Sequence, residues 1–381
     1  MKILHVYRTY FPDTQGGLEE VIRQICLSTK SHQMESRIFC LSRNPSPKQI
    51  ERQEGRVMRR RLDLEIASCG MSLSALRTYS DAARWADVVH YHFPWPFADI
   101  LHLTSTVKRP SVLTYHSDIV RQHLLNTLYK PVMYRFLKSV DSIACTSPNY
   151  FATSEVLNKV ESKVSVIPIG ISESSYPIAS KAVEDSVLKK YGRDYFLFVG
   201  VLRYYKGLQI LLDAITNAPF RVVIAGSGPT EQELKKQAAT LKLTNVIFAG
   251  SVSDEEKTAM MRHCRAVVFP SYLRSEAFGV TLLEGAMHSK PLISTEIGSG
   301  TSHVNIDQKT GIVVLPGSAR ALRRAMDKLY SDAELSSSMG KNARDRFLAH
   351  FTADRMGDRY ANEYRKVTSA ADPTHIKTED H

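Results

Sequence analysis

Residues 269–293 read FPSYLRSEAFGVTLLEGAMHSKPLI, and this stretch decides the fold. It begins at the end of an apolar run, RAVVFPS (265–271), passes through a loop, and enters a helical pattern near Gly279. A second apolar run, PLISTE (291–296), follows the helical pattern. Short apolar runs that alternate with helical segments are typical of parallel strands covered by helices on both faces. The stretch therefore predicts one strand–loop–helix–strand unit of a parallel α/β sheet.

The same alternation extends over the rest of the chain. We expect six strands in each half, at residues 2–7, 36–42, 86–93, 111–117, 141–147, 164–170, 195–201, 221–226, 245–250, 265–271, 291–296 and 311–315. Residues 171–186 are polar and Ser-rich, which predicts a linker. The fold class is therefore α/β, with two doubly wound, Rossmann-like domains at 1–175 and 187–352. We expect a C-terminal helix at about 353–368 to pack back on the first domain, and residues 369–381 to form a loose tail.

The composition agrees with two globular domains. The chain has 381 residues, of which 43% are hydrophobic and 23% charged. Its formal charge is +11, and the excess of basic residues is +6 up to residue 180 (22 − 16) and +5 after it (28 − 23). Because no basic tail carries the charge, we expect no nucleic-acid partner, whereas an anionic substrate or an anionic membrane surface stays open. Two such domains would place the ligand in the cleft between them.

Cysteines and the N-terminus indicate the compartment. The five cysteines are widely spaced and include no CxxC pair, which predicts neither a zinc knuckle nor a disulfide framework. The chain starts with an apolar strand, MKILHVY, that has no features of a signal peptide. No apolar run reaches the roughly 18 residues that a membrane-spanning helix needs. We therefore expect a cytoplasmic protein.

Two glycine-containing loops follow expected strands. Gly16 and Gly17 precede a helix, where bare backbone N–H groups can receive a phosphate or a sugar hydroxyl, although a plain turn is the alternative. Gly226, in AGSGP (225–229), lies in a strand-end turn that lets the backbone approach a nucleotide. Neither loop matches GxGxxG or GxxxxGK[ST], so dinucleotide-binding and P-loop functions are disfavoured.

Charged residues follow the strands of the second half. Arg203 and Lys206 come directly after the strand at 195–201, where two cations suit a diphosphate and a solvated basic turn is the alternative. Glu276 lies in the loop after the strand at 265–271, and Glu284 lies eight residues later in the helix. A helix N-terminus favours a phosphate, and a carboxylate can accept hydrogen bonds from sugar hydroxyls. This setting predicts a nucleotide-sugar site.

The first half offers a histidine and an aromatic pair. His116 stands at the end of an expected strand, where it can bind a sugar hydroxyl or a developing charge, or be a structural histidine of the core. Trp95 and Phe97 can form a sugar-stacking wall or part of the core, and we favour the core.

Two basic stretches also lie in the first half. Residues 119–140 contain Arg121, Lys130, Arg135 and Lys138 with no acidic residue, and residues 52–61 contain five arginines and one glutamate. Such stretches can bind anionic lipid, or they can be solvated surface. The pair leads us to expect peripheral association with the inner face of the plasma membrane.

Together these motifs resemble the retaining glycosyltransferases of family 4, which have the GT-B fold. The EX7E element of that family matches the segment from Glu276 to Glu284. The resemblance implies that Glu284 binds the nucleotide ribose and Glu276 the hydroxyls of the donor sugar. The backbone N–H groups around Phe278, Gly279 and Val280 would hold the diphosphate.

Further matches cover both halves of the chain. By resemblance His116 lies near the reacting sugar, Gly16 and Gly17 form the loop that closes over it, and Val252 and Ser253 edge the nucleobase.

One position departs from the family pattern. Lys206 matches the lysine of the usual KG pair, but Val201 occupies the position where the family has arginine. Arg203 lies two residues later, which leaves open whether it reaches the same phosphate.

The runs LHVYRTYFPDTQGG, TYHSDIV and VGVLRYYKGL are most similar to bacterial lipopolysaccharide O-antigen mannosyltransferases. This resemblance implies transfer of mannose from GDP-mannose to a polyprenyl-diphosphate-linked glycan, with retention and without a metal or cofactor. The alternatives are a transferase that uses a UDP-sugar, a nucleotide-sugar epimerase, and a sugar phosphorylase. A non-catalytic nucleic-acid-binding protein is disfavoured because the chain has no aromatic RNA-stacking motif.

Overall fold

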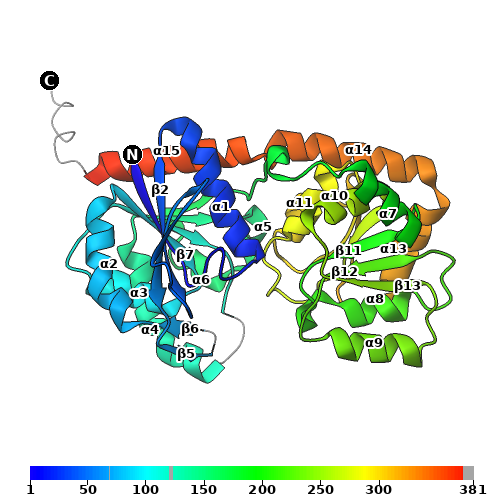
Figure 1. The fold of residues 1–381 in the computed structure, drawn as a ribbon, viewed down its shortest axis with the longest axis horizontal. Coiled ribbons are helices and arrows are strands. Elements are labelled where there is room, and N and C mark those ends of the chain that lie inside the picture. The colour runs from blue at the N-terminus through cyan, green and yellow to red at the C-terminus, as the bar shows by residue number, and fades with distance from the viewer. Residues whose placement is uncertain (68, 120–122, 372–381) are drawn as a thin grey trace. The chain divides into compact units, whose positions relative to one another are not determined.

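The computed structural model describes residues 1–67, 69–119 and 123–371. The chain divides into two compact units (Figure 1). The first unit consists of Met1–Gly170 together with the chain from Ala353 onward, and the second consists of Ile171–Thr352. Each unit is a parallel or mostly parallel sheet with helices on both faces, as the sequence predicts.

The first unit contains an eight-stranded sheet with the order β10-β9-β8-β7-β1-β2-β4-β3. The strands are β1 (Lys2–Val6), β2 (Glu35–Ser42), β3 (Gln49–Arg52), β4 (Gly55–Arg61), β7 (Val88–Phe93), β8 (Ser111–Tyr115), β9 (Ser142–Cys145) and β10 (Val164–Val166). All neighbours pair in parallel except β3 and β4 at the edge, which are antiparallel. A separate hairpin is formed by β5 (Leu64–Ile66) and β6 (Cys69–Met71).

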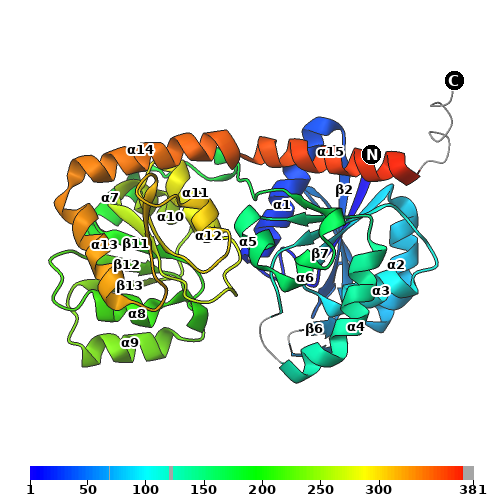
Figure 2. The same ribbon diagram turned by 180° about the vertical axis from the view of Figure 1, so that it is seen from behind.

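Helices cover both faces of this sheet. The helices are α1 (Gly17–Thr29), α2 (Leu73–Trp85), α3 (Pro96–Thr104), α4 (His123–Ser139), α5 (Pro148–Thr153), α6 (Glu155–Asn158) and α15 (Ala353–Ala371). Along β7, His90 bonds Tyr364 of α15, whereas Tyr91 bonds Tyr79 of α2 and His102 of α3. Since neighbouring strand residues point to opposite faces, α15 lies on one face and α2 and α3 lie on the other (Figure 2).

The C-terminal helix packs back on the first unit, which confirms the prediction. Glu363 of α15 accepts a hydrogen bond of 2.6 Å from Ser142, and His32 lies 2.9 Å from Asp358. The helix begins at Ala353 and continues to Ala371, so the first three residues of the predicted tail are helical. The rest of that tail lies outside the described residues.

The second unit contains a six-stranded, fully parallel sheet with the order β13-β12-β11-β14-β15-β16. Its strands are β11 (Phe196–Val199), β12 (Val222–Ala225), β13 (Val246–Gly250), β14 (Ala266–Phe269), β15 (Leu292–Thr295) and β16 (Gly311–Val314). The strand order reverses between β11 and β14, and such a switch point is where doubly wound sheets bind ligands.

Helices flank this sheet on two sides. They are α7 (Lys181–Tyr191), α8 (Leu208–Ala214), α9 (Glu231–Thr240), α10 (Asp254–His263), α11 (Val280–Met287), α12 (Thr301–Val304), α13 (Ala319–Ser331) and α14 (Ala333–His350). In Figure 1, α8 and α9 lie together on one side of the sheet, and α10, α11 and α14 lie on the other.

All twelve predicted strands are present, but the predicted linker is wrong. Residues 171–186 belong to the second unit and include the start of α7. Two ion pairs hold the segment to this unit, between Glu173 and Arg344 (2.8 Å) and between Glu184 and Arg262 (2.5 Å). The second unit therefore begins at residue 171 and not at 187. Its polar surface resembled a linker because the segment packs on the outside of the unit.

Candidate functional site

The loops after β11 and β14 meet at the switch point of the second sheet. Residues 200–207 follow β11, and residues 270–279 follow β14 and lead into α11. Gly207 has φ +71° at the meeting point, and a Cβ atom there would lie 2.1 Å from the carbonyl oxygen of Pro270. A glycine is therefore required for the two loops to approach each other.

This approach brings together two predicted site residues, Lys206 and Glu276. Their side chains form an ion pair and are only 12% and 11% exposed. The same carboxylate oxygen accepts a hydrogen bond of 3.3 Å from Ser271, and the Lys206 Nζ atom lies 4.6 Å from the centre of the Phe269 ring. Burial, with the nearby Glu276 carboxylate, raises the pKa of Tyr205 to about 12. The switch point thus holds a fixed carboxylate and a fixed ammonium side by side.

The N-terminus of α11 adjoins this pair in sequence. Gly279 precedes the helix with φ +87° and no side-chain cap, and a Cβ atom there would lie 3.0 Å from the Phe269 ring. Phe278 is buried, so it offers only its backbone. An uncapped helix N-terminus carries partial positive charge and free N–H donors, which suits an anion. The predicted position of the helix start is confirmed.

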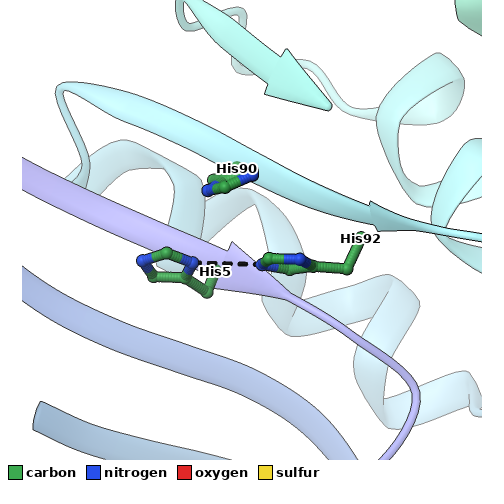
Figure 3. Close-up of side chains that lie close together, drawn as sticks. All are labelled: His5, His90 and His92. Atoms are coloured by element: carbon green, nitrogen blue, oxygen red, sulfur yellow. Dashed lines mark hydrogen bonds between the residues drawn. The ribbon is translucent and has the colours of Figure 1, made fainter. Parts of the chain in front are cut away.

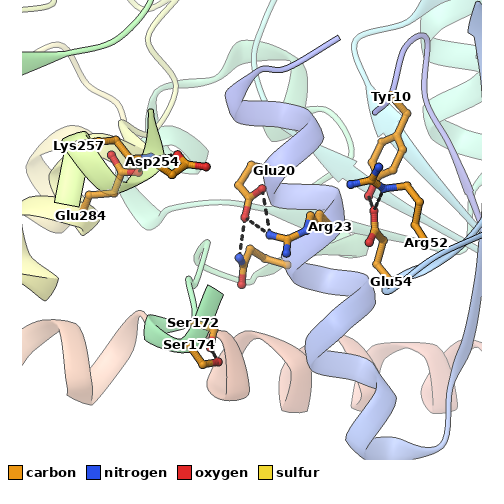
Figure 4. Close-up of polar contacts among 11 residues, drawn as sticks. Tyr10, Glu20, Arg23, Arg52, Glu54, Ser172, Ser174, Asp254, Lys257 and Glu284 are labelled. Carbon is orange, nitrogen blue, oxygen red and sulfur yellow. Dashed lines mark hydrogen bonds and ion pairs between the residues drawn. The ribbon is translucent and has the colours of Figure 1, made fainter. Parts of the chain in front are cut away.

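Glu284 lies in the second turn of α11 and pairs with a lysine that the sequence analysis missed. The Lys257 Nζ atom lies 2.9 Å from Glu284 and 3.1 Å from Asp254 (Figure 4). Burial lowers the pKa of Lys257, but the carboxylates of Glu284 and Asp254 outweigh burial, so its pKa is raised. A local signal was available, because Ser253 and Glu256 form a capping box that places Lys257 in the first turns of α10.

The other predicted residues of the second unit lie at neighbouring strand ends. Gly226 follows β12 with φ +129°, and a Cβ atom there would lie 2.0 Å from the Gly200 carbonyl oxygen. Val252 and Ser253 follow β13, where the Ser253 hydroxyl caps α10. Arg203 is exposed and has no ion-pair partner among residues 1–67, 69–119 and 123–371. The structure thus groups the predicted residues along one edge of the sheet.

In the first unit, Gly16 and Gly17 lead into α1. Gly16 is the N-cap, and a Cβ atom there would lie 2.6 Å from the Glu19 carboxylate, whereas Gly17 faces open space. Glu19 is buried and accepts hydrogen bonds from Thr9 (3.0 Å) and Thr14 (2.7 Å). The loop is thus folded around a carboxylate that the sequence analysis did not single out.

His116 follows β8 and is 4% exposed. Its Nε2 atom lies 3.1 Å from Nδ1 of His92, and Nε2 of His92 lies 3.1 Å from Nδ1 of His5. Figure 3 shows His5 and His92 edge to edge, with His90 beside them. Burial lowers the pKa of His116 to about 3, so this imidazole is neutral at pH 7. The hydrogen-bond partner of its Nε2 atom is another histidine.

Trp95 and Phe97 are core residues, as favoured from the sequence. They are 1% and 3% exposed, and the Trp95 Nε1 atom donates to the Gly70 carbonyl at 3.0 Å. This pair is not available as a sugar-stacking wall.

The two basic stretches differ in what their charges do. Residues 52–61 form the last residue of β3, the turn after it and β4, and the arginines have local partners. Arg59 is 5% exposed and lies 2.9 Å from Asp13, and Arg60 donates to Thr78 at 2.8 Å. Arg59 and Arg60 therefore do not form free basic surface, whereas Arg61 is 76% exposed and lies 3.8 Å from Asp63.

The second stretch keeps an exposed basic face. In α4, Lys130, Arg135 and Lys138 are exposed, and so are Leu128 (78%) and Val132 (36%). Arg121 lies outside the described residues. Among the described residues, no helix is both long and apolar enough to cross a membrane.

Comparison with known proteins agrees with this geometry. The profile described as "Glycosyltransferase Family 4" matches residues 15–175, and "Glycosyl transferases group 1" matches residues 180–346. The chain is 49% identical to D-rhamnosyltransferase WbpZ of Pseudomonas aeruginosa over 93% of each chain. It is 45% identical to O-antigen chain mannosyltransferase C of Escherichia coli, over 96% of this chain and 98% of the relative.

A solved structure shows the same fold. Sucrose-phosphate synthase from Thermosynechococcus elongatus superposes with a TM-score of 0.80 at 19% identity, over 97% of this chain and 100% of the other. The two Rossmann-like units, the full-length relatives and the two matching profiles lead to one conclusion. The chain is a glycosyltransferase of family 4 with the GT-B fold.

Proposed function

We propose that this glycosyltransferase moves mannose from GDP-mannose, with retention, to a polyprenyl-diphosphate-linked glycan in O-antigen biosynthesis. One observation carries the proposal: the buried pair of Lys206 and Glu276 at the switch point, followed in the chain by the uncapped N-terminus of α11. The name of the relative at 45% identity supports the choice of sugar and pathway.

The pair suits the departure of a nucleoside diphosphate. In the proposed reaction, the bond between the anomeric carbon and the diphosphate oxygen breaks, and the acceptor hydroxyl forms a new bond on the same face. The diphosphate takes the hydroxyl proton. Lys206, the N–H groups at the start of α11 and, by the resemblance, Arg203 would stabilise the charge that builds on the diphosphate. Glu276 would hold the sugar hydroxyls, and Glu284 the ribose.

A second donor is favoured by the relative at 49% identity, which is a D-rhamnosyltransferase. D-rhamnose is 6-deoxymannose, so the two donors differ only at the C6 hydroxyl. A site that bonds a hydroxyl rejects an analogue that lacks it by as much as about 10⁴-fold, whereas an apolar pocket discriminates by about 10²-fold or less. Initial rates with GDP-mannose and GDP-6-deoxymannose therefore decide between the donors.

We propose that exposed residues of α4 dock on anionic lipid, close to a lipid-linked acceptor. Leu128, Val132 and Arg135 are spaced four and three residues apart, so they share one face of the helix. Apolar side chains next to basic ones, here Arg135 and Lys138, are typical of peripheral membrane helices.

Calorimetric titration with GDP, UDP and ADP, without added metal, tests the donor site. We expect selective binding of GDP, and we expect Glu284→Gln to weaken it by about tenfold because the ribose loses a charged acceptor. Glu231→Gln is the matched control, since Glu231 pairs with Lys235 on the surface of α9. A preference for UDP would reject the mannosyl donor but keep the transferase. Conversion of the nucleotide sugar without an acceptor would favour an epimerase instead.

A further inference from the structure

A line of polar side chains crosses the face of the first sheet that α15 covers. His5 of β1 pairs in register with His90 of β7, and His92 of β7 pairs with Thr114 of β8. Residues two apart on a strand point to the same face, so His92 follows His90, and His116 follows Thr114. The parallel register therefore places four histidines from adjacent strands next to one another.

Three of these histidines form a continuous chain of hydrogen bonds. Both links are 3.1 Å long, from His5 Nδ1 to His92 Nε2 and from His92 Nδ1 to His116 Nε2. The two rings of each pair are nearly parallel and lie edge to edge, with interplanar angles of 17° and 22° and 5.4 Å between centroids. His90 lies outside this chain, because its two nitrogens bond Tyr364 and Thr114 at 2.7 Å each.

The hydrogen bonds among His5, His92 and His116 must all have the same donor-to-acceptor direction. Burial lowers the pKa of His5 and of His116 to about 3, and it lowers that of His92 well below its usual value. Each ring is therefore neutral at pH 7 and carries one N–H group. Because both nitrogens of His92 are bonded, one donates and the other accepts. Either all three rings carry their proton on Nδ1, so that the N–H groups of His5 and His92 point toward His116, or all three carry it on Nε2, so that the N–H groups of His116 and His92 point away from His116 and toward His5.

The environment of His5, the histidine at the buried end of this hydrogen-bonded series, distinguishes the two directions. The Nε2 atom of His5 is buried and has no hydrogen-bond partner among the described residues. If the N–H groups pointed away from His116, this atom would be a buried donor without an acceptor. If they point toward His116, it is only an unused lone pair. Orphaned buried N–H groups are rarer than acceptors with a free lone pair.

We propose that His5 and His92 are positioning residues that hold His116 in the tautomer with its proton on Nδ1. His116 then donates a hydrogen bond from Nδ1 to the reacting sugar, and it cannot act as a base through that atom. The inference rests on the proposed function and on the family resemblance, by which His116 lies near the reacting sugar.

Metal binding is a less favourable use of the same cluster. His5, His90 and His92 could each offer one nitrogen, and these atoms lie within 4.8 Å of one another. Five of their six ring nitrogens already form hydrogen bonds, and only Nε2 of His5 does not. A metal ion would therefore break at least one bond of His90 and one of His92.

Nitrogen NMR of the protein with ¹⁵N-labelled histidine tests the tautomer directly. We expect the His116 ring, assigned by its loss in His116→Ala, to carry its proton on Nδ1. In His92→Leu, the His116 signals should show a mixture of tautomers, whereas His90→Asn should leave them unchanged. A wild-type His116 with its proton on Nε2 would overturn the proposal, and so would stoichiometric zinc in the purified protein that His5→Phe removes.

Transfer kinetics test the consequence. We expect His92→Leu to lower kcat by about tenfold with little change in the donor KM, and His92→Asn to restore it, because its amide can donate near the Nδ1 position. The double variant His92→Leu/His116→Ala should be no slower than His116→Ala alone, and a further loss would overturn the positioning role. If His92→Leu does not fold, His5→Phe gives the same comparison. A fully active His116→Ala with the expected tautomer would reject contact with the sugar but leave the tautomer assignment intact.

Discussion

Lys206 and Glu276 in the second unit are buried as an ion pair, whereas His5, His92 and His116 in the first unit are buried without a charged partner. Both groups lie at or near the carboxyl ends of parallel strands. A buried carboxylate needs an opposite charge, but an imidazole can lose its proton and bond another imidazole. The two sites therefore respond differently to pH and to substitution.

The largest expected effect is that acid destabilises the first unit. Burial holds the pKa of His5 and His116 at about 3, and holds those of His90 and His92 well below normal. Below about pH 6.5 the unfolded chain binds protons that the folded unit excludes. The free energy of unfolding should therefore fall by up to about 1.4 kcal/mol per pH unit for each of these histidines.

Tryptophan fluorescence measures this effect selectively, because both tryptophans of the chain, Trp85 and Trp95, lie in the first unit. Urea unfolding at pH 7, 6 and 5 gives the slope of the free energy of unfolding against pH. His5→Phe should lower this slope by up to about 1.4 kcal/mol per pH unit, the contribution of one histidine. A stability that stays constant from pH 7 to 5 would contradict the neutral histidine chain.

The next largest effect is expected at the ion pair. Lys206→Met should lower kcat by about 10²–10³-fold, because a donor to the leaving group is lost and Glu276 keeps a buried, unpaired charge. Lys235→Met is the control, since Lys235 forms an exposed ion pair with Glu231. Transfer rates and thermal melts are measured together. A Lys206→Met rate within threefold of the wild-type rate would remove this pair from the reaction.

A smaller effect is expected at the second pair of the same unit. Lys257→Met leaves Glu284 without its 2.9 Å partner, so GDP should bind about tenfold more weakly. Asp254→Asn should change the affinity by about twofold or less, because the Asp254 side chain is 75% exposed. Calorimetry compares the two variants. Equal losses of affinity in the two variants would contradict a specific role for the ion pair between Lys257 and Glu284.

The smallest effect contrasts the two basic stretches. Arg135→Gln in α4 should reduce binding to vesicles that contain anionic lipid by about fivefold, since one surface charge contributes about 1 kcal/mol and Arg135 shares the face of Leu128 and Val132. Arg61→Gln in β4 should have little effect, although its side chain is 76% exposed, because its neighbours Arg59 and Arg60 point into local contacts. Co-sedimentation measures both, and an equal loss in the two variants would argue against a specific docking face on α4.

Strands that are buried on both faces were predictable because their apolar runs are continuous. β4 was missed because it ends in three arginines, Arg59 to Arg61, and because only the burial of Arg59 against Asp13 makes the pattern fit a sheet. The false linker has a similar origin. Glu173 and Glu184 look like solvated residues until Arg344 and Arg262 are placed beside them.

The sequence by itself determined the elements and the motif residues that are close together in the chain. Glu276, Gly279 and Glu284 lie within one loop and one helix, so their relative placement is a local property. Tertiary structure decided the partners. Lys206 and Glu276 are 70 residues apart, and His5 and His92 are 87 apart. Their contacts depend on which strands are neighbours, and hydrophobic periodicity reveals strands without revealing their order.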